Sequence, residues 1–202
     1  SKWKIWDYMF EGDMDAINPA NNSPGIGSPV DTPDLSECTS WFAAFRSNQQ
    51  AWSGDYPNEQ KLGDFDLSNI VSAYECFKDS NVCGLSASSV SKPLKDANWD
   101  SCQIFEGCFN IQGSPSAVNN KQTKLDVSGW TFNQNNDDIS MHSMFNFHTI
   151  GVDSGPQAGL ASWDVSNVIN FESFLNSATS FNEDLGSWDV SKAKNMRTMF
   201  IS

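Results

Sequence analysis

The two histidines, His142 and His148, are the first residues to consider for metal binding or nucleophilic catalysis. An imidazole can serve as a zinc ligand or as a general base. Two zinc-binding histidines on one helix stand at positions i and i+4, and this pair is six residues apart, so the spacing does not fit. Nucleophilic catalysis also needs a base that a third group orients, and the surrounding sequence shows no such group. We therefore predict a structural role for both histidines.

Asp164 and Asp189 are the carboxylates that most resemble a catalytic pair, because both occur in the segment Trp-Asp-Val-Ser. Two carboxylates are what a glycosidase uses. A catalytic acid, however, is needed once in an enzyme and not once in every copy of a repeat. A repeated Asp-x-Ser is more typical of a turn or cap, in which the side-chain oxygen accepts a backbone N–H. We predict that the chain is not an enzyme and has no catalytic residues and no cofactor.

Two acidic stretches, Glu11–Asp15 and Asn133–Asp138, bring together several oxygens that could bind calcium. Neither stretch has the spacing of carboxylates and glycine that an EF-hand loop requires. Solvated loops are the alternative interpretation, and we favour it, so the sequence predicts no metal site.

The most informative feature of the sequence is a repeated pattern, which is clearest in Trp163–Leu175 and Trp188–Phe200. When the Asp of each copy is counted as position zero, bulky residues fall at positions +7, +10 and +11. Weaker copies precede these two, and position zero then falls at residues 34, 66, 98, 134, 164 and 189. The residues at +7, +10 and +11 are Trp41, Ala44, Phe45; Ala73, Cys76, Phe77; Phe105, Cys108, Phe109; Met141, Met144, Phe145; Phe171, Phe174, Leu175; and Met196, Met199, Phe200.

Each copy predicts a short strand followed by a short helix. Asp-Val-Ser-Asn-Val alternates apolar and polar residues, which is typical of a half-buried strand. Spacings of three and four residues between the bulky positions are typical of one face of a helix. A single copy cannot bury its apolar face, whereas stacked copies can. The fold class that we predict is therefore an α/β repeat solenoid with leucine-rich-repeat-like coils of short strand plus short helix, separated by irregular loops. In the fourth copy the strand is either Leu125–Ser128 or Asn136–Ile139.

The last copies resemble a known family of repeats. Ser180–Ser191 reads Ser-Phe-Asn-Glu-Asp-Leu-Gly-Ser-Trp-Asp-Val-Ser, and Asn195–Phe200 reads Asn-Met-Arg-Thr-Met-Phe. Both are similar to the BspA-like surface-protein repeat, a family that includes mycoplasma lipoprotein repeats of unknown function. The resemblance is strong over 162–200, weak over 34–145 and absent from 1–33. It implies leucine-rich-repeat-like coils in a cell-surface or secreted protein linked to adhesion, with no enzymatic activity attached to the repeat.

The first 33 residues differ from the rest of the chain. Trp3, Trp6 and Phe10 are three and four residues apart, which would place them on one helical face, and a stretch rich in proline and glycine follows them. We divide the chain into an aromatic arm and linker, 1–33, and a solenoid of about six coils, 34–202, which we expect to be incomplete at its C-terminal end. The three aromatic residues are the predicted partner-binding residues. The arm would either cap the first coil or insert into a partner.

Two further predictions follow from the shared positions. The six residues at position +11 should form one buried column. Cys76 and Cys108 share position +10 in adjacent copies, so they could form a disulfide, with Cys83 as a competing partner. The alternative is that the five cysteines are buried free thiols that pack as small hydrophobic residues.

Charge narrows the classes of partner. The chain has 12 Lys and Arg residues against 25 Asp and Glu residues, for a net charge of −13. Such a surface repels nucleic acids, whose binding requires cations that neutralise phosphates. No apolar run is long enough to span a membrane.

We expect a structural or protein-binding module that binds other protein subunits and is extracellular, on a cell surface or in an organelle lumen. The alternatives are a peripheral scaffold subunit of a membrane-associated assembly and a carbohydrate-binding adhesion module.

Overall fold

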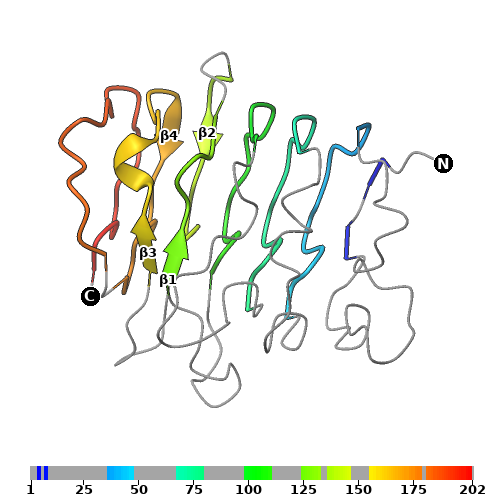
Figure 1. Ribbon diagram of the computed structural model, residues 1–202, viewed down its shortest axis with the longest axis horizontal. Coiled ribbons are helices and arrows are strands. Elements are labelled where there is room, and N and C mark those ends of the chain that lie inside the picture. The colour runs from blue at the N-terminus through cyan, green and yellow to red at the C-terminus, as the bar shows by residue number, and fades with distance from the viewer. Residues whose placement is uncertain are drawn as a thin grey trace.

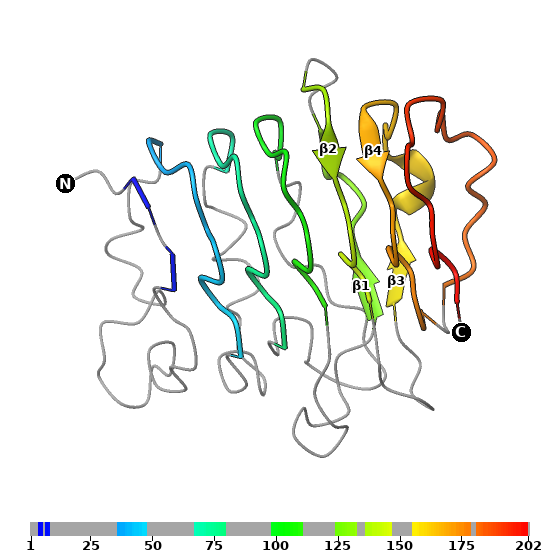
Figure 2. The same cartoon turned by 180° about the vertical axis from the view of Figure 1, so that it is seen from behind.

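The structure, a computed structural model, is described for residues 4, 5, 7, 8, 36–47, 67–79, 98–110, 124–132, 136–146, 155–178 and 181–201. The described segments lie side by side in chain order, and the N-terminal and C-terminal segments are at opposite ends of the row (Figures 1 and 2). The boundary predicted between residues 33 and 34 lies outside the described residues.

The regular elements are short. Strand β1 (Lys124–Asp126) pairs in parallel with β3 (Gly155–Ala158), and β2 (Ile139–Ser140) pairs in parallel with β4 (Val168–Asn170). A 3-10 helix, η2 (Leu160–Ser162), follows β3. Isolated parallel bridges extend the β2–β4 pairing in both directions, and they join Ile5 to Ser40, Ser40 to Ser72, Ser72 to Ile104, Ile104 to Ser140, and Asn170 to Asn195.

Apart from Ile5, every residue in this series of bridges occupies position +6 of its copy. We call the segment from position +5 to position +12 of each copy a rung. The first rung, around Ile5, precedes the first predicted copy, and the last rung contains Asn195 and Phe200.

The prediction of an α/β repeat solenoid with leucine-rich-repeat-like coils is wrong. The described residues contain no α-helix, and their sheets have two strands each. The segments predicted as the helical halves of the coils are successions of tight turns. The copies therefore lack the helices that the predicted coils require.

The backbone hydrogen bonds explain why these segments are not helical. In an α-helix every N–H donates to a carbonyl four residues earlier in the same segment. Here the N–H at +10 folds back to the carbonyl at +7, as in Cys76 N to Ala73 O at 3.2 Å, whereas the N–H groups at +7, +9 and +11 donate to the next rung. Ala73, Glu75 and Phe77 donate in this way to Ile104, Glu106 and Cys108 at 2.8–2.9 Å.

Alternate backbone N–H groups can point toward the next rung because one residue in each rung has a left-handed backbone conformation. The residue at position +9 has a φ between 49° and 62° in all six copies: Ala43, Glu75, Gly107, Ser143, Ser173 and Thr198. A left-handed conformation is energetically unfavourable for a residue other than glycine. The hydrogen bonds between rungs and the packing of the core side chains must therefore outweigh this cost.

The residues at +7, +10 and +11 point into the core, as predicted. In the first five copies all fifteen are buried, with at most 3% of each side chain exposed. Four members of the +11 column, Phe45, Phe77, Phe109 and Phe145, stack with ring centroids 5.2–5.6 Å apart. Leu175 is also buried, whereas Phe200 in the last rung is 58% exposed because no described rung covers it.

Each of the two ranges proposed for the fourth copy overlaps a strand, since β1 includes Leu125 and Asp126 and β2 begins at Ile139. Ile139–Ser140 is the one that continues the series of bridges, since Ser140 pairs with Ile104 and with Asn170. The segment that directly follows β1 passes close to the turn that begins at Gly159, where φ is 110° and an added Cβ would lie 2.2 Å from the Ser128 nitrogen. This close approach requires glycine.

Replacing Phe109 by alanine should lower the free energy of unfolding by about 3–5 kcal/mol, because it opens a cavity in the stacked column. Phe200→Ala is the matched control, since the same side chain at the same position is exposed, and we expect little change from it. Denaturant titration of the two variants measures the difference. Equal losses of stability would show that the column is not the core.

Candidate functional site

The recurring aspartates form turns. The Oδ1 atoms of Asp164 and Asp189 accept the backbone N–H of Ser166 at 3.0 Å and of Ser191 at 2.9 Å. The hydrogen bonds from Ser191 hold the pKa of Asp189 below its usual value. The prediction of a side-chain turn at each Asp-x-Ser is therefore confirmed at these two positions.

Of the two histidines, His142 lies at position +8 of its rung and is partly exposed, while His148 lies outside the described residues. In the described part of the chain, no group of three or more His, Cys, Asp or Glu side chains could hold a metal ion. In the second acidic stretch, Asp137 and Asp138 instead pair with Lys192 at 3.0 Å and Lys194 at 3.3 Å, beside a shallow pocket of about 590 Å³.

Four of the five cysteines, Cys38, Cys76, Cys102 and Cys108, are described, and all four are buried free thiols. The predicted disulfide between Cys76 and Cys108 is therefore wrong, and the alternative interpretation, small buried hydrophobic residues, holds for these four. Burial raises the pKa of Cys102 to about 12 and also holds the pKa of Cys76 well above its usual value. The fifth cysteine, Cys83, lies outside the described residues.

The predicted partner-binding residues Trp3, Trp6 and Phe10 lie outside the described residues. Their described neighbours continue the row of rungs. Ile5 forms a parallel bridge to Ser40, and Lys4 O accepts Thr39 N at 3.0 Å. Tyr8 N donates to Phe42 O at 2.9 Å, which is the bond that position +9 makes in later rungs.

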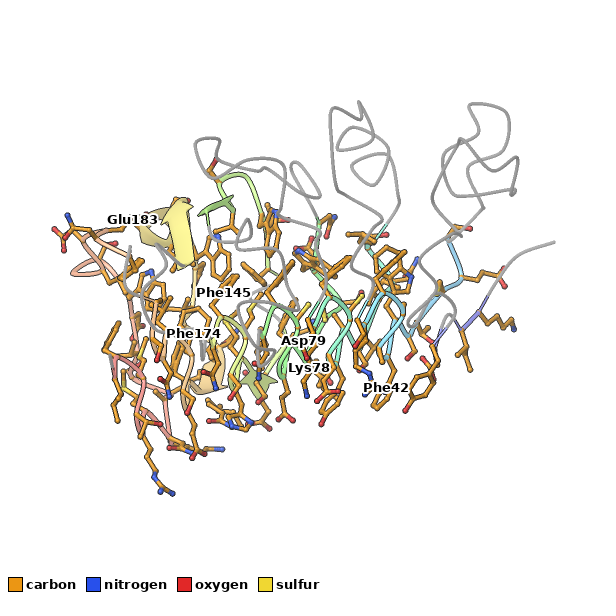
Figure 3. All side chains as sticks on the ribbon, turned by 90° about the horizontal axis from the view of Figure 1, so that it is seen from below. Phe42, Lys78, Asp79, Phe145, Phe174 and Glu183 are labelled. Carbon is orange, nitrogen blue, oxygen red and sulfur yellow. The ribbon has the colours of Figure 1, made fainter. Side chains whose placement is uncertain are left out.

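An exposed row of aromatic side chains begins at this first rung. Tyr8 and Phe42 have ring centroids 5.1 Å apart, and Phe42 stacks on Tyr74 at 4.8 Å with the rings 5° from parallel. Tyr8 is 48% exposed, and Phe42 and Tyr74 are partly exposed. We call these three residues the aromatic strip. Figure 3 shows Phe42 at the outer edge of the molecule, whereas Phe145 and Phe174 lie inside it.

Three further exposed apolar side chains lie in the same rungs and the next one, and we call them and the aromatic strip together the lateral face. Ile5, Val71 and Ile104 occupy positions +5 or +6 of the first, third and fourth rungs and are 58%, 39% and 37% exposed. Exposed apolar side chains that gather on one face are a feature of interaction sites.

A charged group flanks the aromatic strip. Glu75 accepts Arg46 at 2.8 Å and Lys78 at 2.7 Å, and the Arg46 guanidinium lies 5.5 Å from the centre of the Tyr8 ring. Burial acts to raise the pKa of Glu75, but the hydrogen bonds and charges of Lys78 and Arg46 outweigh it and hold the pKa below its usual value. The side chains beside the strip are thus fixed in place.

The aromatic strip could have been predicted from the sequence, but the sequence analysis considered only the core positions +7, +10 and +11. Phe42 and Tyr74 each stand at +8, one residue after an inward +7 residue, so an alternating pattern would expose them. Trp6, Met9 and Phe10 also have the spacing of +7, +10 and +11, which places Tyr8 at +9. Because the arm was interpreted as a helix, this match to the spacing of the repeat was not recognised.

Comparison with known protein families gives a match to part of the chain. The family described as Mycoplasma protein of unknown function, DUF285, matches residues 114–202. That range holds the two clearest copies of the repeated pattern, so the second part of the chain is similar to a mycoplasma family of unknown function. No curated protein and no solved structure matches the chain. The finer resemblance to BspA-like surface-protein repeats stays a prediction.

The structure also bears on membrane insertion. Among the described residues, no helix has the length and apolar character needed to cross a bilayer.

The four described cysteines should resist alkylation in the folded protein and react fully after denaturation, because all four are buried. For Cys76 and Cys102 the raised pKa further suppresses the reactive thiolate. Mass spectrometry of tryptic peptides after iodoacetamide treatment, with and without denaturant, measures this difference. A disulfide-linked peptide pair containing Cys76 and Cys108 would contradict the structure.

Glu75→Gln should lower the free energy of unfolding by about 1.5–3 kcal/mol near neutral pH, because two charge-assisted hydrogen bonds weaken. The pKa of Glu75 is lower in the folded protein than its ordinary value of 4.5. The ionised Glu75 therefore makes its full contribution to the free energy of unfolding above pH 4.5. This contribution is lost as the pH falls through the pKa that Glu75 has in the folded protein. Urea titrations across this range should show the wild type and the variant converging in acid, and a gap independent of pH would contradict the assignment.

Proposed function

We propose that the chain is a non-enzymatic protein-binding module and that the lateral face around the aromatic strip is its binding surface. The observation that carries the proposal is the exposed row Tyr8, Phe42 and Tyr74, continued by Ile5, Val71 and Ile104. Aromatic residues and arginine are enriched at protein interfaces, where they supply much of the binding energy.

The fixed position of the strip supports this proposal. Tyr8, Phe42 and Tyr74 come from three successive rungs, and backbone hydrogen bonds of 2.8–3.3 Å hold those rungs in register. The Asp7 carboxylate further fixes the second rung, since it accepts the Ser40 hydroxyl and the Phe42 N–H. A surface that is already ordered loses little conformational freedom when a partner binds.

The ring geometry gives less support to the alternative of a carbohydrate-binding module. A sugar stacks on the open face of an aromatic ring, whereas Phe42 has Tyr74 on one side at 4.8 Å and Tyr8 on the other at 5.1 Å. The Tyr8 ring in turn has the Arg46 guanidinium 5.5 Å from its centre. The strip therefore offers mainly ring edges, which suit apolar side chains of a protein partner.

We further propose that the chain is located at a cell surface, outside the cell or in an organelle lumen. Residues 114–202 are similar to a mycoplasma family, and the predicted BspA-like repeat family includes mycoplasma lipoprotein repeats, so the two agree with a surface location. The partner is then another protein subunit or a protein ligand at that surface.

The double variant Val71→Asp, Ile104→Asp should abolish partner binding without unfolding the chain, because it places two charges in the apolar face at exposed positions. The matched control is Val190→Asp, Ile201→Asp, which alters two exposed apolar residues of the last copy. Native proteins captured by the wild type, the variant and the control are compared by quantitative mass spectrometry, with unfolding midpoints measured alongside. Partners that the control retains and the variant loses are the expected result. Identical capture by all three would contradict the assignment of this face.

A further inference from the structure

The outward residues at position +8 change from aromatic to charged along the row of rungs. Phe42 and Tyr74 occupy this position in the first two copies. Glu106, His142 and Glu172 occupy it in the next three copies, and all five side chains are partly exposed. The apolar lateral face therefore continues into an acidic segment of the same row.

Backbone hydrogen bonds hold this acidic segment in register. Gly107 N donates to His142 O at 2.8 Å, and Ser143 N donates to Glu172 O at 2.8 Å. The side chains at +8 thus come from neighbouring rungs, with His142 on the rung between the two glutamates. At the usual spacing of neighbouring strands, Glu106 and Glu172 lie about 10 Å apart along the row.

Neutral side chains position the two carboxylates without removing their charge. Glu106 Oε1 accepts the Ser140 hydroxyl at 2.8 Å, and Glu172 Oε2 accepts the Asn195 amide at 2.8 Å. The other oxygen of Glu172 lies 3.9 Å from Arg197, whose side chain is 77% exposed, and solvent weakens such a pair. In the described part of the chain, no cation pairs with Glu106. Both carboxylates therefore attract a cationic ligand.

We propose that the partner of the lateral face is a basic polypeptide segment. Its apolar side chains contact Tyr74 and Ile104, and its Lys or Arg side chains bind the carboxylates at +8. Ile104 is 37% exposed and stands two residues before Glu106 in the same rung, so an apolar and an acidic side chain face outward together. This inference rests on the proposed function and specifies the chemistry of the partner.

Charge complementarity supports a basic partner over an acidic one. The chain carries a net charge of −13, which steers cationic molecules toward it and repels anionic ones. The two cations that flank the aromatic strip do not reverse this preference, because Arg46 and Lys78 both pair with Glu75 at 2.8 Å and 2.7 Å.

Fluorescence anisotropy with two labelled peptides tests the proposal. The basic probe is Leu-Ser-Leu-Ser-Lys-Ser-Lys, and the acidic probe has Glu in place of each Lys. In an extended chain the leucines and the charged residues lie on one side, and seven residues span about 20 Å, which matches five rungs. The wild type should bind the basic probe at least about tenfold more tightly than the acidic probe at low salt, with the ratio falling as salt is added.

Glu106→Gln, Glu172→Gln removes both charges and keeps an oxygen for the Ser140 and Asn195 donors. It should weaken binding of the basic probe by about tenfold. The matched control is Asp164→Asn, Asp189→Asn, which changes the net charge by the same amount at exposed turns, and it should bind like the wild type. Unfolding midpoints establish that each variant is folded.

The proposal is overturned if the basic probe fails to bind, if the two probes bind the wild type equally, or if the control loses as much affinity as the Gln variant. Val71→Ser, Ile104→Ser tests the proposed function separately, because it removes apolar surface without altering charge. Unchanged binding of the basic probe by this variant would contradict the lateral face as the binding surface. Loss of both probes in this variant, with no effect of the Gln variant, would retain the surface and overturn the basic partner.

Discussion

The structure depends on one arrangement of the backbone, in which alternate N–H groups of each rung donate to the next rung. This arrangement requires a left-handed residue at position +9, and the six copies supply one with φ between 49° and 62°. The cost of that conformation recurs in every copy, and so do the hydrogen bonds and aromatic stacking that offset it. Because the N–H groups at +7, +9 and +11 obtain their acceptors from the neighbouring rung, a single rung cannot satisfy these three donors by itself.

The same arrangement determines which side chains are available for binding. Residues at +7, +10 and +11 are directed inward, where Phe45, Phe77 and Phe109 stack, and the intervening residues at +8 are directed outward. Neighbouring rungs thus place equivalent outward residues side by side, which is how Phe42 and Tyr74 become a stacked pair at 4.8 Å. A binding surface on this face arises from the spacing of the rungs and needs no loop to position it.

The sequence was sufficient to predict which residues form the core but not the conformation that buries them. Spacings of three and four residues are shared by a helix and by successive turns, and the choice between them depends on hydrogen bonds to a neighbouring rung that no single copy reveals. Glycine at Gly107 was a signal of left-handed backbone, but Glu75 and Ser143 adopt the same conformation without it. The aromatic strip was missed for a related reason, because a helical interpretation assigns no common face to residues at +8.

Hydrogen exchange of individual amides in dilute solution tests the ladder most directly. The account predicts slow exchange for Glu75, Gly107 and Ser173, whose N–H groups donate to the next rung. Fast exchange at Glu75 and Gly107 would contradict it.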